Sequence, residues 1–140
     1  EIMKTGRVHE VPMSKQLKIL LMGMPRVYEY VFTSDHFKRK GEPINRESVR
    51  LMFSKAGLGG IQTAHGIRSI GATWLAEQGI REDVAELCLA HSSDNQVRKA
   101  YQRSEFLDKR RPVMQQWCDY VDECRAKAHE KIRKELTKQS

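Results

Sequence analysis

Two polar residues three positions apart, His65 and Arg68, are the first candidates for chemistry in this sequence. In a helix, residues at this spacing lie about 60° apart around the axis and project from one face. An arginine offers a planar fork of donors that matches phosphate oxygens, and a neighbouring imidazole can donate a further hydrogen bond or move a proton. The pair is therefore a candidate anion site, although the spacing alone is more typical of an ordinary polar helix surface.

The helix that would carry this pair is one of several that the sequence predicts. Potential capping residues precede apolar residues spaced three and four apart, and glycines follow them, which is the pattern of amphipathic helices with defined ends. These helices begin after Ser14, Asn45 and Thr63 and end at Gly23, Gly57 and Gly79. A fourth begins near Glu82 and stops near His91, where the imidazole would suit the negative end of the helix dipole.

The C-terminal part of the chain is predicted to be helical as well. A polar loop over residues 92–95 leads to a short helix with Val97 and Tyr101, and a long helix follows from about Glu105 or Pro112. Because a proline ring removes a hydrogen bond and clashes with the preceding turn, we expect Pro112 to kink this segment or to restart the helix.

The apolar faces of these helices predict the core. The side chains expected to point inward are Leu17, Leu20, Leu21, Ile67, Ile70, Trp74, Leu75, Val84, Leu87, Cys88, Leu107, Met114, Trp117, Cys118 and Val121. From Arg125 onward the apolar stripe thins to Ile132 and Leu136, while six Lys or Arg residues stand against two glutamates. We expect that tail to be a solvated helix or to fray.

The N-terminal segment differs from the rest. Thr5-Gly6 is a turn signal, and Val8, Val11 and Pro12 suit a short strand that ends at the proline, so a small hairpin is expected with Lys4 near its tip. The predicted fold class is therefore mainly α (α+β), a helical domain with a small N-terminal β-hairpin.

Composition restricts the class of partner. The chain has 140 residues and a formal net charge of +7, which suits one domain with a polyanionic partner or an anionic surface. No apolar run approaches the roughly 18 to 20 residues of a membrane span, and the N-terminus lacks signal-peptide architecture, so we expect a cytoplasmic protein with no membrane partner. Three cysteines are too few and too irregular for a disulfide framework, and reduced thiols are expected.

Three short boxes, in this order, are more specific than any single residue. They read TAHGIRS over 63–69, LAH over 89–91 and VRKAY over 97–101. Together they resemble the catalytic boxes of the tyrosine recombinases (phage integrase family), above all those of prophage and genomic-island integrases. The segment MKTGR over 3–7 also resembles the hairpin that holds the family's catalytic lysine. The resemblance extends to about Asp122.

The resemblance implies a role for five residues. Tyr101 would attack a scissile DNA phosphate to give a 3′-phosphotyrosyl intermediate and a free 5′-hydroxyl. Arg68 would hold the non-bridging oxygens, where negative charge builds in the transition state. His65 would accept a proton or donate a hydrogen bond, and His91 would donate a hydrogen bond to the same phosphate. Lys4 would protonate the leaving 5′-oxygen, and neither ATP, a metal nor another cofactor is required.

A free phenol has a pKa of about 10, so roughly one part in a thousand is ionised at pH 7, and a cationic cluster with a base would supply the needed activation.

DNA that reaches Tyr101 must also pass over the cations beside it. The candidate DNA-binding residues are Arg98, Lys99 and Arg103, together with the loop cluster Lys38, Arg39 and Lys40. The pair Arg110-Arg111 is open to either interpretation, as phosphate contacts or as solvated charges.

The implied function is site-specific recombination that integrates or excises a prophage or genomic island. The implied partners are double-stranded DNA with paired attachment core sites, three further copies of the protein in a homo-tetramer on DNA, and two accessory proteins, a DNA-bending factor and an excisionase. The family's first catalytic arginine lies in an upstream motif resembling Arg-x-Gly-Glu, which does not occur here. We therefore expect residues 1–122 to be the C-terminal part of the catalytic domain and residues 123–140 a basic tail, with upstream domains absent and little or no cleavage by the isolated fragment.

Two alternatives come from other classes. The helix that ends at Gly79 and the one that begins near Glu82 would also suit a helix-turn-helix, which makes a non-catalytic DNA-binding regulator the second hypothesis. That interpretation leaves Lys4, His91 and Tyr101 without roles. Cys88 and His91 have a tolerable spacing for a metal, but Cys88 also lies on an apolar helix face, and a core thiol is favoured.

Overall fold

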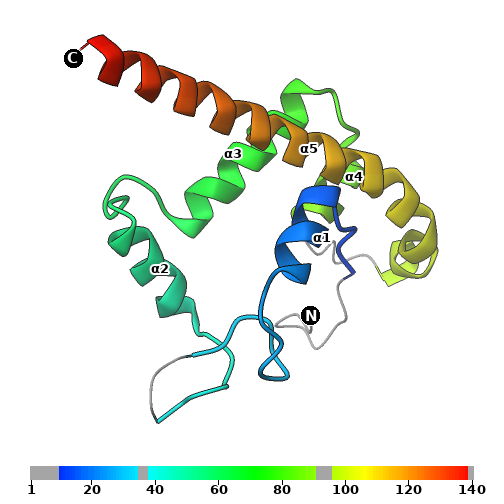
Figure 1. The fold of residues 1–140 in the computed structure, drawn as a ribbon. Coiled ribbons are helices and arrows are strands. Elements are labelled where there is room, and N and C mark those ends of the chain that lie inside the picture. Colours follow the sequence, from blue (N-terminus) through cyan, green and yellow to red (C-terminus); the bar gives the residue numbers. More distant parts are fainter. Residues whose placement is uncertain (1–9, 35–37, 91–95, 139–140) are drawn as a thin grey trace. The chain divides into compact units, whose positions relative to one another are not determined.

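A computed structural model describes residues 10–34, 38–90 and 96–138 of the chain, with the backbone alone for Arg46 and for residues 96–105. The described part is mainly helical (Figure 1). The helices are α1 (Lys15–Met22), α2 (Arg46–Lys55), α3 (Ala64–Glu77), α4 (Glu82–Cys88) and α5 (Gln96–Lys138). The fold class predicted from the sequence is confirmed in its helical part.

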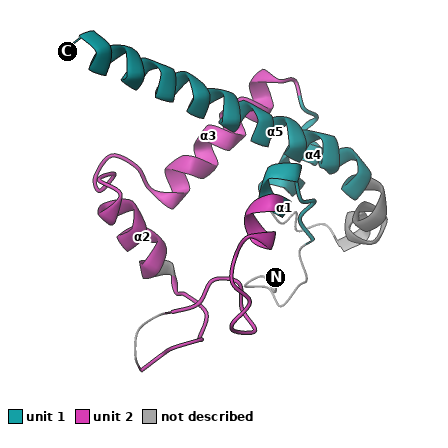
Figure 2. Cartoon of the chain, viewed as in Figure 1, with its two compact units in different colours: residues 1–18, 80–140 teal, residues 19–79 magenta. Residues whose placement is uncertain are grey.

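The chain divides into two compact units, which Figure 2 shows in different colours. Unit 1 comprises residues 1–18 and 80–140 and therefore contains α4, α5 and the first turn of α1. Unit 2 comprises residues 19–79 and contains the rest of α1 together with α2 and α3. The boundary after Lys18 thus falls inside α1.

Unit 2 is built from two capped helices. The Asn45 side chain accepts a hydrogen bond from the Ser48 backbone N–H at 2.9 Å, and Gly57 beyond the helix end has a φ of 74°. Side-chain caps satisfy backbone donors that have no partner within the helix, and a left-handed residue after the last turn favours glycine. The helix boundaries predicted from Asn45 and Gly57 are confirmed.

The buried part of α3 is smaller than its apolar pattern suggests. Trp74 and Leu75 are buried, as predicted, with 6% and 5% of their surface exposed. Ile67 and Ile70 were expected inside but are 43% and 48% exposed. Helical periodicity identifies an apolar face, but only the C-terminal part of this face is covered.

The loop before α2 contains an isolated antiparallel bridge between Thr33 and Pro43. The Ser34 N–H donates to the Glu42 carbonyl at 2.8 Å. Gly41 in this loop has a φ of 85°, and a Cβ atom there would lie 2.7 Å from a ring carbon of Tyr28, so both conformation and space favour glycine. The hairpin predicted around Lys4 lies outside the described residues, and Val11 and Pro12, which are described, belong to no strand.

In unit 1, a polar network joins the first turn of α1 to α5. The Lys15 backbone N–H donates to Gln115 Oε1 at 2.9 Å, and Gln115 Nε2 donates to Gln16 Oε1 at 2.9 Å. Asp119 Oδ1 accepts from Gln16 Nε2 at 2.6 Å and from Gln115 Nε2 at 2.8 Å. Ser14 caps α1 by accepting from the Leu17 N–H at 3.1 Å, as its position predicted.

This network predicts an acid-dependent loss of stability. The hydrogen bonds from Gln16 and Gln115 hold the pKa of Asp119 below its ordinary value of 3.8. A lowered pKa in the folded state means that the carboxylate contributes stability above the unfolded pKa and loses it as the pH falls through the folded pKa. We expect Asp119→Asn, which keeps an acceptor oxygen but does not titrate, to flatten the decline in unfolding free energy below about pH 4.

Urea unfolding of the chain followed by circular dichroism between pH 7 and pH 3 would measure this decline. Asp108→Asn, a change at an exposed carboxylate outside the network, is the matched control and should keep the wild-type slope. If Asp119→Asn instead keeps the wild-type slope, the stability of the network does not depend on the charge of Asp119.

The C-terminal helix corrects one expectation. The sequence predicted a short helix around Tyr101 and either a kink or a restarted helix at Pro112. α5 is one helix from Gln96 to Lys138 with Pro112 inside it, so no new helix starts there. Proline removes the hydrogen bond to the carbonyl four residues earlier, which belongs to Asp108. Both residues are exposed, so water can satisfy that carbonyl, and the buried residues on either side hold the helix in place.

The core of unit 1 lies where α4 packs against α5. Its buried side chains are Val84, Phe106 and Val113. The sequence placed Val84 there, but it assigned the α5 stripe to Leu107 and Met114, which are only half-buried. The buried face of α5 therefore starts one residue earlier than predicted and runs through Phe106, Arg110 and Val113.

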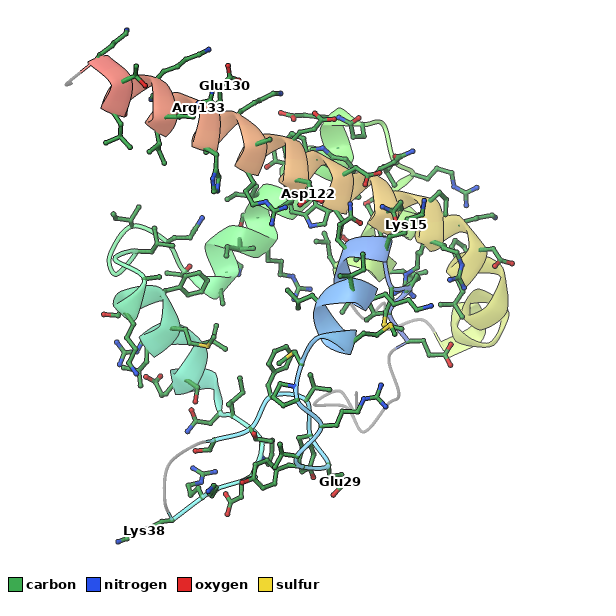
Figure 3. The ribbon with its side chains drawn as sticks, in the orientation of Figure 1. Lys15, Glu29, Lys38, Asp122, Glu130 and Arg133 are labelled. Carbon is green, nitrogen blue, oxygen red and sulfur yellow. The ribbon has the colours of Figure 1, made fainter. Side chains whose placement is uncertain are left out.

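From Arg125 to Lys138, α5 is a solvated helix, as predicted. Ile132 and Leu136 are exposed. Salt bridges join residues about one helical turn apart, as between Lys134 Nζ and Glu130 Oε1 at 2.6 Å. Such pairs support an isolated helix weakly, by about 0.2–0.5 kcal/mol each. In Figure 3 the labelled Glu130 and Arg133 project from this part of α5. None of the helices in the described ranges is long and apolar enough to cross a membrane.

Candidate active-site residues on α3 and α5

The start of α3 is fixed by two side chains that precede it. Thr63 caps the helix, because its hydroxyl accepts a hydrogen bond from the Gly66 N–H at 3.0 Å. Gln62 Oε1 in turn accepts from the Thr63 N–H at 2.9 Å. These bonds define the first helical turn, and they therefore define the direction in which His65 and Arg68 leave the backbone.

His65 and Arg68 are both exposed and lie one turn apart at this capped end of α3. The N-terminal end of a helix attracts anions through its partial positive charge and its exposed N–H groups. An imidazole and a guanidinium at the same end add directed donors to that field. The structure therefore brings these two predicted residues together in a position suited to binding a phosphate.

Gly66, between the two, leaves room for Gln62. A Cβ atom at Gly66 would lie 2.1 Å from Gln62 Oε1, so any larger residue would displace the Gln62 side chain from its bond to Thr63. Because the contact is with the end of a flexible side chain, such a change is expected to alter the helix start without unfolding it.

The cap supports a stability prediction. Thr63→Ala removes the acceptor for the Gly66 N–H and should lower the free energy of unfolding by about 1 kcal/mol, the usual value for a lost N-cap. Thr63→Ser keeps the hydroxyl and should stay close to wild type. Urea unfolding of the two variants side by side would measure the difference, and equal losses would show that the methyl group of Thr63 matters instead of its oxygen.

Two of the predicted catalytic residues, Lys4 and His91, lie outside the described residues. The residue before His91 is described and is unusual, because Ala90 has a φ of 54°. A left-handed residue at the end of a helix is normally glycine, and alanine adopts this conformation at some energetic cost. The end of α4 thus turns sharply just before the position of His91.

The remaining predicted residues lie in the third box or two residues after it, at the start of α5. Tyr101, Arg98, Lys99 and Arg103 all have helical backbone, and the structure describes their backbone only. The sequence therefore predicted the helical state of this segment correctly. The roles assigned to these side chains remain predictions.

The loop cluster, Lys38 to Lys40, is exposed. Arg39 is partly neutralised, because its Nε donates to Glu42 Oε2 at 2.8 Å. Figure 3 shows Lys38 extending from the loop that leads to α2. Exposed flexible cations of this kind suit contacts with phosphates that carry no sequence information.

Arg110 is the residue whose burial was not predicted from the sequence. The pair Arg110-Arg111 was interpreted as phosphate contacts or solvated charges, but Arg110 is only 5% exposed, and its Nη2 donates to the Glu10 carbonyl at 2.8 Å. The available signal was its spacing of four and three from Phe106 and Val113, which places it on a buried helix face.

The three cysteines form no disulfide, as predicted. Burial raises the pKa of the Cys88 thiol, and the nearby Arg110 guanidinium opposes this shift through its charge and a hydrogen bond. Cys88 is therefore a protonated, half-buried thiol at neutral pH. Within the described ranges, no three His, Cys, Asp or Glu side chains gather as they would around a metal ion.

Comparison with known proteins gives a consistent result. The phage integrase family matches residues 1–107. Prophage integrase IntA of Escherichia coli K12 is 44% identical over 122 residues, which are 85% of this chain and 29% of that protein. Prophage integrase IntS of the same strain and the integrase of Shigella phage Sf6 are each 36% identical over 126 residues, covering 87% of this chain and 32% of the relative.

The chain thus spans about a third of the length of these relatives. No solved structure gives a significant match. The family match covers more than half of the chain and includes all three boxes, from His65 to Tyr101. The chain therefore belongs to the phage integrase family.

Proposed function

We propose that the protein containing this chain is a tyrosine site-specific recombinase that integrates or excises a prophage or genomic island. The observation that carries the proposal is the exposed pair His65 and Arg68 at the capped start of α3, in a chain of the phage integrase family. The names of the similar proteins support it, because they include prophage and phage integrases. Family membership does not favour the helix-turn-helix regulator.

The proposed reaction exchanges one phosphodiester for another. The Tyr101 oxygen forms a bond to the phosphorus, and the bond from phosphorus to the 5′-oxygen breaks. His65 accepts the phenolic proton, and Lys4 gives a proton to the leaving 5′-oxygen. The product is a 3′-phosphotyrosyl link with a free 5′-hydroxyl, and rejoining reverses these steps with another strand.

Arg68 and His91 are assigned to the phosphate itself. A guanidinium can donate two parallel hydrogen bonds to the non-bridging oxygens, and these bonds strengthen as charge accumulates in the transition state. The Arg68 side chain is exposed at the start of α3. Because the charge stays balanced by protein groups and the bond energy is conserved, the proposal involves neither a metal nor ATP.

Duplex DNA with paired attachment core sites is the proposed partner. The net charge of +7 supports a polyanion, and the six cations assigned to it lie near Tyr101 and in the loop before α2. We further propose a homo-tetramer on DNA in the bacterial cytoplasm, with a DNA-bending factor and an excisionase as accessory proteins. Residues 1–122, including a hairpin around Lys4, are assigned to the catalytic domain, and residues 123–140 to its basic tail.

The proposal is tested with the protein expressed from its complete reading frame. This protein is incubated, in EDTA and without ATP, with nicked DNA that spans the chromosomal junction of its element. A denaturing gel should show protein joined to the DNA 3′ end, and mass spectrometry should find the link on the peptide that contains Tyr101. Salt-dependent binding without any adduct would overturn the proposal and favour the regulator.

A further inference from the structure

A surface groove in unit 1 is not used by the proposed reaction. It lies between the first turn of α1 and α5, and its volume is about 410 Å³. Its walls include Lys15 and Lys18 from α1, Arg111 and Pro112 from α5, and Met13 from the segment before α1. All of its lining residues belong to unit 1, so the groove is a feature of one compact unit.

The described walls of this groove carry three exposed cations, Lys15, Lys18 and Arg111, and no acidic side chain. Lys15 is attracted to the carboxylate of Asp119. Lys18 and Arg111 differ from it, because neither makes a salt bridge with another residue of the described ranges. The groove therefore presents two cations, one from each helix, to an anion from outside the chain.

The backbone that presents these cations is held in place. The Lys15 N–H donates to Gln115 Oε1, and Gln115 Nε2 donates to Gln16 Oε1, so the first turn of α1 is fixed against α5. In Figure 3 the labelled Lys15 lies at this turn. Lys15 and Lys18 are three positions apart, which places their Cβ atoms about 5–6 Å apart on one helix face. A groove fixed in this way loses less conformational freedom on binding than a flexible loop does.

The chemistry of the walls fits the backbone of a nucleic acid. Proteins contact DNA mostly through its phosphate oxygens and sugars, and Lys and Arg are the usual donors to the phosphates. Met13 and Pro112 add apolar surface, which a sugar ring can cover and a free phosphate ion cannot. The chain's own tail is a poor occupant, because the residues from Arg125 onward carry six cations against two glutamates.

We propose that this groove binds the sugar–phosphate backbone of the DNA duplex, with one phosphate held between Lys18 and Arg111. This inference rests on the proposed recombinase function, which supplies the duplex. The contact is separate from the six cations already assigned to DNA. Because a phosphate contact carries no sequence information, the groove would fix the register and orientation of the protein on its site.

Loss of this contact has an expected size. Each phosphate that a protein neutralises releases counterions, which contributes about 0.9 to the slope of log affinity against log salt concentration. Lys18→Gln combined with Arg111→Gln should therefore reduce that slope by about 0.9 and weaken DNA binding roughly fivefold at 0.15 M salt. Both side chains are exposed, so the double variant should fold as wild type does.

The test uses the full-length protein and duplexes of its core site in which one phosphate at a time is replaced by an uncharged methylphosphonate. Wild type should lose affinity roughly fivefold when the phosphate held in the groove is replaced. The double variant should be insensitive to replacement at that one position, because its contact is already lost. Lys18→Arg combined with Arg111→Lys keeps both charges and should keep the wild-type pattern.

The matched control is Arg125→Gln combined with Lys127→Gln. These exposed cations of α5 pair with Asp122 and Glu123, so the same change in charge outside the groove should leave every position as sensitive as in wild type. A groove variant that also keeps the wild-type sensitivity at every position would show that the groove does not hold DNA. If that variant instead loses association between copies in sedimentation, the groove holds an acidic protein segment, and the proposal is wrong.

The same preparations distinguish this proposal from the proposed function. Adduct formation on nicked core-site DNA without methylphosphonates is measured in parallel with affinity. No adduct from wild type would overturn the recombinase, whereas the pattern of sensitive phosphates alone decides whether the groove binds DNA. A wild-type protein that does not bind its core site at all would overturn both.

Discussion

Replacing Tyr101 with phenylalanine is expected to abolish the covalent protein–DNA adduct. The variant lacks the oxygen that would bond to phosphorus, and the aromatic ring keeps its size. Removing the nucleophile of an enzyme costs at least about 10⁴-fold in rate, so no adduct should appear on a denaturing gel. DNA affinity should change little, because most of it comes from contacts between cations and phosphates.

The matched control is Tyr120→Phe. Tyr120 lies on the same helix as Tyr101 and is 40% exposed. The centroid of its ring lies 5.8 Å from the centroid of the Trp117 ring. Removing its hydroxyl makes the same chemical change to the protein without touching the third box, and adduct formation should stay at the wild-type rate. An adduct that persists in Tyr101→Phe and disappears in Tyr120→Phe would contradict the assignment of the nucleophile.

The local parts of this fold follow from local sequence signals. Helices α1, α2 and α3 begin after Ser14, Asn45 and Thr63, because each of these side chains accepts a backbone N–H that the helix itself leaves unpaired. The continuation of α5 as one helix through Pro112 was not predictable in the same way. The cost of a proline depends on whether the freed carbonyl is solvated and on what the neighbouring turns bury.

Burial was harder to predict than helix position. Periodicity placed Trp74 and Val84 inside correctly, but it placed Ile67 and Ile70 there as well, although they are exposed. A pattern within one helix does not say how much of its apolar face another segment covers. Arg110 shows the opposite error, because its partner is a carbonyl 100 positions away in the sequence.

The candidate site was predicted from the order and spacing of its residues in the sequence, and not from a pattern of burial. His65 and Arg68 emerge together at the start of α3, as the spacing of three requires. Their chemical roles came from the resemblance of three boxes to a family, and the family match agrees with that resemblance. The local signals could not assign roles, because a polar pair on a helix is common and its meaning depends on residues far along the chain.

Arg68→Lys is expected to slow adduct formation by about 10²–10³-fold, the usual loss when a transition state loses one preorganised donor. Lysine keeps the positive charge but presents a single point donor, whereas the guanidinium can hold two non-bridging oxygens at once. DNA affinity should fall only slightly, since one phosphate contact among several is weakened and not removed. Because Arg68 is exposed, the free energy of unfolding should stay within about 0.5 kcal/mol of wild type.

Arg50→Lys is the matched control for this change. Arg50 lies on α2 in the same unit, is exposed, and pairs with Glu47 at 2.7 Å. Single-turnover rates and DNA affinities of both variants, measured over a range of salt concentrations, separate transition-state binding from general electrostatics. A rate loss confined to Arg68→Lys at every salt concentration means that the geometry of the guanidinium is essential. Equal rates in both variants would mean that α3 contributes charge alone, and the phosphate would then have to be held by other residues of the protein.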